Sequence, residues 1–333
     1  MKVSIIIPVY NVALYIERCI KSVMSQTYNG DIECILVNDA SPDDSIDIAK
    51  RLIADYKGPI QFRILNHEQN RGLSATRNTG IDAATGDYLY FFDSDDEITP
   101  DCIEKLSRPV LNDPTIEMVD GCYTTITTDG NNDVVEIPHP RPQLEFTSRK
   151  AVRSFFFSRQ NENKSTWNKL TSKKFILKNK LYFKEGVCWE DFLWHFQYNR
   201  YLSRLYIVPD ITYKYHIRPK SIITGTPQER IRYFYGIIYE EIANGFTPEE
   251  CAQEVKYLLN GFCHFYLRGQ VPLEYKHVAS IFLKVLKENH CIKDWLFLKT
   301  IILLSKIQFA GEIVKKIGAF LKNIGKHRNP NKA

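Results

Sequence analysis

The first part of the chain, up to residue 100, changes repeatedly between two patterns of hydrophobic and polar positions. Near-continuous apolar runs at 3–10 and 33–39 predict strands that are buried in a parallel sheet, and two further strands are predicted at 62–66 and 87–92. Apolar residues at helical spacing between these runs predict helices from Asn11 to Val23, over 41–56 and over 73–84. Asn11 and Ser41 are the expected N-caps of the first and second helices, with Pro42 at the first position of the second. Strands that alternate with helices predict right-handed βαβ units.

Beyond residue 100 the pattern is looser. It predicts strands at 116–126, 134–137, 205–210 and 212–217, and helices over 147–157 and 190–202. From Pro227 onwards the spacing of apolar residues is almost entirely helical. The segment 295–325 is both apolar and basic, so it is expected either to pack on the main domain or to lie in a membrane interface.

Composition narrows the classes of protein that the pattern allows. The 333 residues are 44% hydrophobic and 25% charged, which is enough apolar content for a packed core, and the net charge of +5 is too small to indicate nucleic-acid binding. The eight cysteines form no CxxC pair, which argues against a disulfide framework and favours a reduced, cytoplasmic setting. The apolar run before Pro8 is too short for a signal peptide, and no run is long enough to span a bilayer.

Acidic and amide side chains follow the predicted strands. In open parallel sheets ligands bind beyond these carboxyl ends. The run 89–92 leads directly into Asp93, Ser94 and Asp95, and neither a GxGxxG nor a GxxxxGK[ST] motif is present to bind phosphates. Two carboxylates one residue apart can hold Mg²⁺ or Mn²⁺ with positions open for pyrophosphate oxygens. A solvated acidic turn is the simpler alternative, and a calcium loop is disfavoured because Ile98 stands where that loop needs glycine.

Five segments in order carry a resemblance to a known family: "VSIIIPVYN" at 3–11, "VNDAS" at 37–41, "NRGLSATRNTGIDAATGDYLYFFDSDD" at 70–96, "WNKL" at 167–170 and "WEDFLW" at 189–194. With them the chain resembles the family 2 glycosyltransferases of the GT-A fold, which make bacterial surface polysaccharides. The resemblance implies an α/β fold with a mostly parallel central sheet flanked by helices. It also implies a catalytic domain over 1–222, with a nucleotide-binding half (1–104) and an acceptor half (105–222), followed by a helical region over 223–333.

The resemblance assigns roles in the donor site. Asp39 is expected to bind the nucleotide base, with Pro8 and Tyr10 lining the same pocket. Ala40 stands where relatives commonly have glycine. Asp93, Ser94 and Asp95 match the DXD motif, with Asp95 as the expected metal ligand and Asp93 near the ribose or the metal.

Further residues are assigned to the helices and to the acceptor half. Arg77 and Asn78 either face the nucleotide or lie on a solvated helix face. Asp191 matches the acid that acts as catalytic base in relatives; without the resemblance, acids at a helix start would only complement the helix dipole. Lys169 is expected to shape the acceptor site or reach the diphosphate. His216 and Arg218 are expected to contact phosphate.

The reaction implied is the inverting transfer of one sugar from a nucleotide-sugar, most simply a UDP-sugar, with Mn²⁺ or Mg²⁺. The acceptor is expected to be a hydroxyl of a saccharide or of a lipid-linked saccharide. The QxxRW motif of processive relatives is absent, which favours transfer of a single sugar. Two alternatives remain open: a nucleotidyltransferase, although its glycine-rich N-terminal loop is missing, and a non-catalytic nucleotide- or sugar-binding protein.

Overall fold

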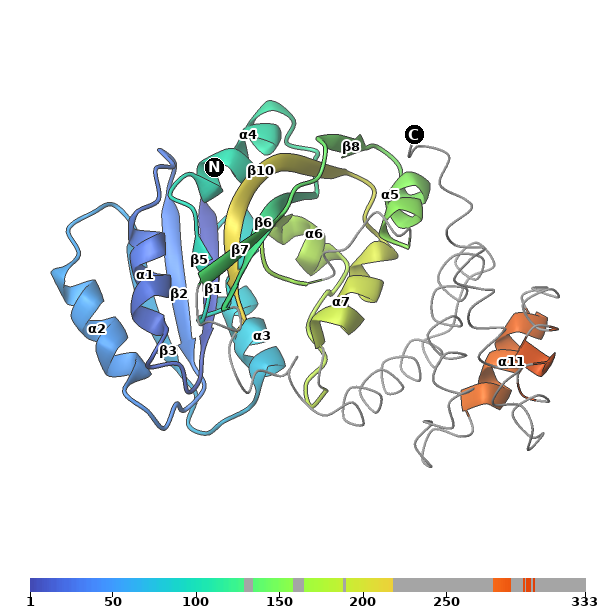
Figure 1. Cartoon of the computed structure of the whole chain (residues 1–333), viewed down its shortest axis with the longest axis horizontal. Coiled ribbons are helices and arrows are strands. Elements are labelled where there is room, and N and C mark those ends of the chain that lie inside the picture. The colour runs from blue at the N-terminus through green and yellow to red at the C-terminus, as the bar shows by residue number, and fades with distance from the viewer. Residues whose placement is uncertain are drawn as a thin grey trace. The chain divides into compact units, whose positions relative to one another are not determined.

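The structure is a computed structural model of the whole chain, and it describes residues 1–128, 134–157, 165–187, 190–217, 278–288, 296, 298–300 and 302. The chain divides into two units, Met1–Thr224 and Gly225–Ala333. Within the first unit, the described strands form one ten-stranded sheet with helices on both of its faces (Figure 1).

The first four strands are parallel, as predicted from their apolar runs. They are β1 (Val3–Val9), β2 (Ile32–Asn38), β3 (Gln61–Asn66) and β4 (Tyr88–Phe91), and they lie in the order β3-β2-β1-β4. Every residue of β1 and β4 is buried, which explains the absence of polar alternation in these runs. The helices that connect them are α1 (Ile16–Met24), α2 (Ser45–Asp55) and α3 (Leu73–Ala83).

Two helices begin one turn later than predicted. Asn11 does not cap α1, because it takes a left-handed conformation with φ 54° and donates its N–H to Ser41 Oγ at 2.8 Å. Ser41 in turn donates to Asp43 Oδ1 at 2.6 Å, and α2 begins only at Ser45. The Ser41 side chain, which was predicted to cap a helix, therefore joins the β1–α1 and β2–α2 loops to each other.

The second part of the sheet is mixed. Its strands are β5 (Glu97–Ile98), β6 (Met118–Thr128), β7 (Val134–His139), β8 (Leu144–Phe146), β9 (Lys169–Ser172) and β10 (Leu205–His216). The sheet continues from β4 in the order β9-β6-β10-β5, with β7 beside β6 and β8 beside β10. The two short strands predicted at 205–210 and 212–217 are one strand, and register shifts around Ile211 accommodate Pro209.

Helices enclose a core on each face of the sheet. Buried side chains of α1, α2 and α4 (Cys102–Asn112) pack on one face. Those of α3, α5 (Arg149–Phe156), α6 (Lys173–Lys178) and α7 (Glu190–Asn199) pack on the other. On this second face Trp194 lies against Phe91 and Phe183, and burying such a side chain contributes about 1.5–3 kcal/mol. The core therefore holds α3 and α7 beside the end of β4, where the acidic segment begins.

Of the second unit the structure describes the helix α11 (Val278–Glu288) and a few residues near 300. Within the described parts of the chain, no helix combines the length and the apolar character needed to cross a bilayer. Most of the segment 295–325, predicted to be a candidate for membrane association, lies outside the described residues, and so does Arg218.

Candidate functional site

The carboxyl ends of β1, β2 and β3 lie level with one another. Val9 pairs with Asn38, and Asn38 pairs with Asn66, so the three strands end along one line at this edge of the sheet. Pro8 is buried within β1, whereas Tyr10 just beyond it is 48% exposed. The edge therefore presents an exposed aromatic ring above a buried strand end, which suits the stacking of a flat base.

Asp39 follows β2 at this edge, and its carboxylate is already engaged by the chain. It accepts hydrogen bonds from the backbone N–H groups of Arg71 and Gly72, each at 2.8 Å. Its Oδ1 also lies 2.7 Å from His67 Nδ1. An ionised carboxylate has about four acceptor positions, so roughly one remains for a ligand. Asp39 thus fixes the β3–α3 loop beside the strand end.

The backbone conformation of Ala40 is one that glycine adopts easily, which agrees with the glycine expected at this position from the family resemblance. Its φ is 53°, in the left-handed region that glycine adopts at no steric cost. The tight turn lets Ser41 donate its N–H to Asn38 Oδ1 at 2.9 Å.

Side chains of the acidic segment after β4 alternate between exposed and buried positions. Asp93, Asp95 and Glu97 are partly exposed, whereas Ser94 and Asp96 between them are buried. This alternation places the two DXD carboxyls on the open side of the segment. The backbone carbonyl of Asp95 accepts a hydrogen bond from the Arg18 side chain, which fixes the turn.

The two acids without a predicted role bind the end of β10. Asp96 accepts hydrogen bonds from the Tyr213 hydroxyl at 2.6 Å and from the His216 backbone N–H at 2.8 Å. Glu97 Oε1 lies 2.8 Å from His216 Nε2. Burial, with Arg18 next, lowers the pKa of His216. His216, predicted to contact phosphate, is therefore held beside the DXD segment by its two following acids.

Arg77 joins the DXD segment to α7. Its guanidinium is 3% exposed, with Nη2 2.9 Å from Asp93 Oδ1 and Nη1 2.6 Å from Glu190 Oε1. It also lies over the Phe183 ring, 5.3 Å from the centroid. Burial opposes its charge, but Asp93, Glu190 and Asp191 outweigh that effect and raise the pKa of Arg77. The side chain does not lie on a solvated helix face.

Asn78 is also directed inward. Its Nδ2 donates to the Phe183 carbonyl at 2.9 Å, and its Oδ1 accepts from the Phe183 N–H at 2.8 Å. Both ends of the amide are used by one backbone residue, so Asn78 anchors the segment that precedes α7 to α3.

Glu190 and Asp191 begin α7 and differ in their surroundings. Glu190 is buried against Arg77, whereas Asp191 is partly exposed and accepts a hydrogen bond from the Phe192 N–H at 2.7 Å. Burial and then Glu190 raise the pKa of Asp191 to about 7, against the lowering effect of Arg77. A carboxyl that titrates near neutrality is suited to take a proton from a hydroxyl.

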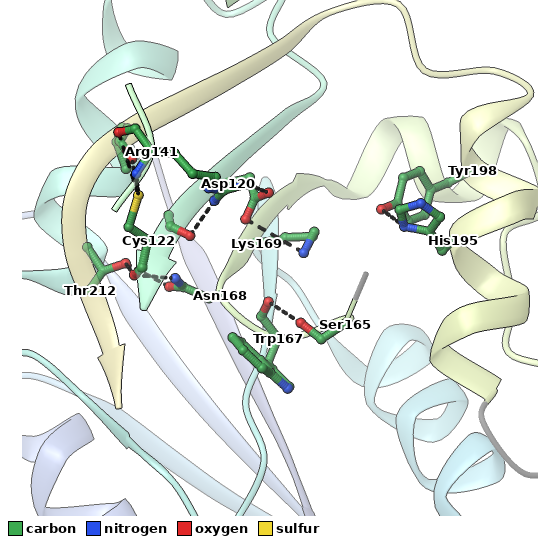
Figure 2. Close-up of polar contacts among 12 residues, drawn as sticks. Asp120, Cys122, Arg141, Ser165, Trp167, Asn168, Lys169, His195, Tyr198 and Thr212 are labelled. Atoms are coloured by element: carbon green, nitrogen blue, oxygen red, sulfur yellow. Dashed lines mark hydrogen bonds and ion pairs between the residues drawn. The ribbon is translucent and has the colours of Figure 1, made fainter. Parts of the chain in front are cut away.

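The residues Trp167, Asn168 and Lys169 project in three directions (Figure 2). Trp167 stacks on Tyr213 with ring centroids 4.4 Å apart. Asn168 has φ 60° and donates to the Cys122 carbonyl at 2.9 Å. Lys169 is fully buried in the sheet, and its Nζ lies 3.6 Å from Asp120 Oδ1.

A divalent cation can be accommodated at the DXD carboxyls. Among the described residues there is no group of three or more His, Cys, Asp or Glu placed to hold an ion. Mg²⁺ and Mn²⁺ commonly take only one or two carboxylates, with substrate phosphates completing the coordination. Asp93, whose side chain is 27% exposed, and Asp95 supply such a pair.

The structure thus brings Arg77, Asp93 and Glu190 into contact and places Asp191 beside them. Asp39, Pro8 and Tyr10 form a separate group at the ends of β1 and β2. Sequence reasoning missed His67, Asp120 and Arg141 as members of buried polar clusters. Of these three residues, only Asp120 could have been singled out from the sequence, because it is a charged residue inside an otherwise strand-like apolar run.

The fold and the acids at its strand ends define an α/β protein of the GT-A type. The model of the family described as "Glycosyl transferase family 2" matches residues 4–197, more than half of the chain. The chain therefore belongs to glycosyltransferase family 2, and the predicted family, fold and enzyme class are confirmed.

Two curated relatives are bacterial. YibD of Escherichia coli strain K12, named an uncharacterized glycosyltransferase, is 29% identical over 222 residues, which are 66% of this chain and 63% of YibD. EpsH of Bacillus subtilis strain 168 is 32% identical over 232 residues, which are 66% of this chain and 62% of EpsH. The match thus covers less than two thirds of the length of either relative.

Two solved structures share the fold. Staphylococcus aureus TarS 1–349 in complex with UDP-GlcNAc aligns with a TM-score of 0.62 at 19% identity, over 87% of this chain and 80% of that chain. The mannosyltransferase PcManGT from Pyrobaculum calidifontis, in complex with GDP-Man and Mn²⁺, aligns with a TM-score of 0.56 at 18% identity, over 97% of this chain and 86% of that chain. At these identities the likeness establishes the fold alone.

Proposed function

We propose that this chain transfers a single sugar, with inversion, from a UDP-sugar to a hydroxyl of a saccharide or lipid-linked saccharide in surface polysaccharide synthesis. The observation that carries the proposal is the Arg77 bridge, which ties Asp93 of the DXD segment to the acid pair of α7. The acid proposed to bind the donor is thereby linked, through Arg77 and Glu190, to the candidate base Asp191, which follows Glu190 on α7. The UDP-GlcNAc complex of TarS supports the choice of donor class.

In the proposed donor site, Tyr10 and Pro8 lie against the base and Asp39 accepts a hydrogen bond from it through its remaining acceptor position. Asp95, with Asp93, would hold Mn²⁺ or Mg²⁺, which when bound supplies positive charge to the leaving diphosphate. The Mn²⁺ of PcManGT supports this choice. His216, and Arg218 beyond it, lie on the segment proposed to face the diphosphate.

The proposed reaction is one displacement. The Asp191 carboxylate accepts the proton of the acceptor hydroxyl as its oxygen attacks the anomeric carbon. The bond from that carbon to the diphosphate oxygen breaks, and the diphosphate leaves with the electron pair. Attack from the face opposite the leaving group converts an α-linked donor into a β-linked product.

The first experiment measures release of UDP from a panel of UDP-sugars with MnCl₂ and saccharide acceptors. Asp191→Asn is expected to lower turnover by about 10²–10⁴-fold, the usual contribution of a general base, without altering the affinity for UDP. Asp55→Asn, on the exposed end of α2, is the matched control and should not change turnover. Near-normal turnover in folded Asp191→Asn would remove the base from the proposal.

The family assignment favours transfer of a sugar over the nucleotidyltransferase alternative. A non-catalytic binding protein would instead bind UDP without releasing it from any UDP-sugar. NMR of the anomeric proton of the product tests inversion, because a β-linked product from an α-linked donor is required.

The chain is also proposed to lie at the cytoplasmic surface of a membrane through residues 295–325. Flotation with vesicles of anionic lipid should decrease when Lys299, Lys306, Lys315 and Lys316 are all changed to Gln in the full chain. Equal flotation of both proteins would contradict this part of the proposal.

A further inference from the structure

A buried group of charges lies in the second part of the sheet, away from the acids discussed above. Asp120 on β6 is fully buried and accepts a hydrogen bond from Arg141 Nη1 at 2.7 Å. Arg141 also donates from Nη2 to the Gly121 carbonyl at 2.6 Å. Lys169, equally buried, lies 3.6 Å from the other oxygen of Asp120 and has no hydrogen-bond partner for its ammonium. Figure 2 shows Arg141 and Lys169 on opposite sides of Asp120.

The strand register places this group beneath α7. Asp120 pairs with Lys169 across β6 and β9, and Leu170 pairs with Tyr90 across β9 and β4. Continuing that register by one residue brings Lys169 beside Phe91. Phe91 contacts Trp194 of α7, with ring centroids 5.7 Å apart.

Asp191 lies on the same face of α7 as Trp194, because residues three apart in a helix share a face. The negative charge of Asp191 also favours the charged form of Lys169. Burial lowers the pKa of Lys169 to about 8; Asp120 opposes this effect, Arg141 adds to it and Asp191 opposes it.

Two buried cations share the carboxylate of Asp120. Arg141 lies 2.7 Å from one of its oxygens, and Lys169 lies 3.6 Å from the other, where the ammonium makes no hydrogen bond. Asp191 forms no ion pair within 4.0 Å among the described residues, and Arg77 is paired with Asp93 and Glu190. The group around Asp120 therefore carries a positive charge that Asp120 alone does not balance, and buried charges need partners of opposite sign.

We propose that Lys169 is a positioning residue for the reaction: its ammonium, fixed in the sheet by Asp120, holds the Asp191 carboxylate in its charged, proton-accepting form. This inference rests on the proposed function, in which Asp191 is the base. Lys169 does not need to touch either substrate, which agrees with its complete burial. Asp120 and Asp191 both favour its charged form, against the effect of burial.

Other charged and titratable groups lie around Asp191 and Lys169, on α7, on α3, in the DXD segment and in the sheet. They are Glu190, His195 and Tyr198 on α7, Arg77 on α3, Asp93 after β4, and Asp120 and Arg141 in the sheet region. Lys169→Met removes one positive charge from this region at nearly constant volume. A carboxylate that loses a neighbouring cation binds its proton more tightly, so a base at that position becomes active only at higher pH.

The test is the pH dependence of turnover, measured as UDP release with saturating UDP-sugar, acceptor and MnCl₂. In Lys169→Met the acid limb of the profile should move upward by about one pH unit, and turnover should recover towards the wild-type value above that limb. Lys169→Arg retains the charge and should retain the position of the limb. Lys174→Met, on the exposed side of α6, is the matched control and should change neither.

Lys169→Gln removes the same charge but keeps a polar end beside Asp120, and it decides the matter if Lys169→Met does not fold. Its acid limb should move upward as in Lys169→Met. A purely structural role would lower turnover equally at every pH, and that result, or a limb that does not move in either variant, overturns the inference. If Asp191→Asn retains full turnover, the assignment of Asp191 as the base is wrong, regardless of the results for the Lys169 variants.

Discussion

Replacing Arg77 by Met tests whether this one side chain holds the acidic segment after β4 to α7. The guanidinium is 3% exposed and forms ion pairs of 2.6 Å with Glu190 and 2.9 Å with Asp93. A hydrogen bond to a charged group contributes about 1.5–3 kcal/mol. Glu190 is buried, so its bond should take the upper part of that range, whereas the bond to Asp93 is screened because that side chain is 27% exposed.

We therefore expect Arg77→Met to lower the free energy of unfolding by about 3–4 kcal/mol, within the range for breaking a buried ion pair. Urea unfolding followed by tryptophan fluorescence measures this directly. Arg51→Met, on an exposed position of α2, is the control and should change stability by less than about 0.5 kcal/mol. A loss below about 1 kcal/mol for Arg77→Met would refute the reasoning.

Arg77→Lys separates charge from geometry. An ammonium keeps the positive charge but lacks the planar fork that reaches two carboxylates at once, so about half of the stability loss should remain. A double-mutant cycle with Glu190→Gln isolates the pair, for which a coupling energy of about 1–3 kcal/mol is expected. Strict additivity of the two substitutions would show that the residues do not act together.

Three further outcomes follow from the site. Because the pKa of Asp191 is raised to about 7 and the base must be ionised, kcat/KM should fall about tenfold per unit below pH 6, and a rate that is flat down to pH 5 would contradict the assignment. Gly121→Ala would place a Cβ 2.2 Å from Thr212 Oγ1, so urea unfolding should show a loss of about 1–3 kcal/mol; wild-type stability would show that the strands can separate. Asn168→Ala should destabilise the protein more than Asn168→Gly, since both lose the side-chain hydrogen bonds but only alanine is strained at φ 60°; the reverse order in urea would contradict this.

The strands β1, β2 and β4 were predictable because they are buried on both faces of the sheet. Continuous apolar runs such as that of β1 have few alternative structures, and the acids that follow them must lie at a sheet edge. The starts of α1 and α2 were not predictable. A cap is a local pattern, whereas Ser41 and Asp43 are used by the neighbouring loop thirty residues away.

In the second part of the sheet the short strand β9 escaped prediction. Its four residues include the buried, charged Lys169, so neither alternation nor an apolar run marks it. A propensity argument cannot anticipate that Asp120 on β6 lies opposite this lysine, because the pairing of β9 with β6 is a tertiary contact. β10 was predicted as two strands, 205–210 and 212–217, although register shifts around Ile211 let one strand continue.

The acidic segment shows why the kind of site was easier to predict than the roles of its members. Sequence order suggests that Asp93, Asp95, Asp96 and Glu97 form one acidic group. In the structure, Asp96 is buried and accepts a hydrogen bond from Tyr213. Glu97 lies beside His216, and Asp93 lies beside Arg77. Repulsion between the carboxylates is therefore relieved in part by the chain itself, before any cation binds. Asp95, whose backbone carbonyl accepts a hydrogen bond from Arg18, is the acid on which the metal-binding proposal depends most.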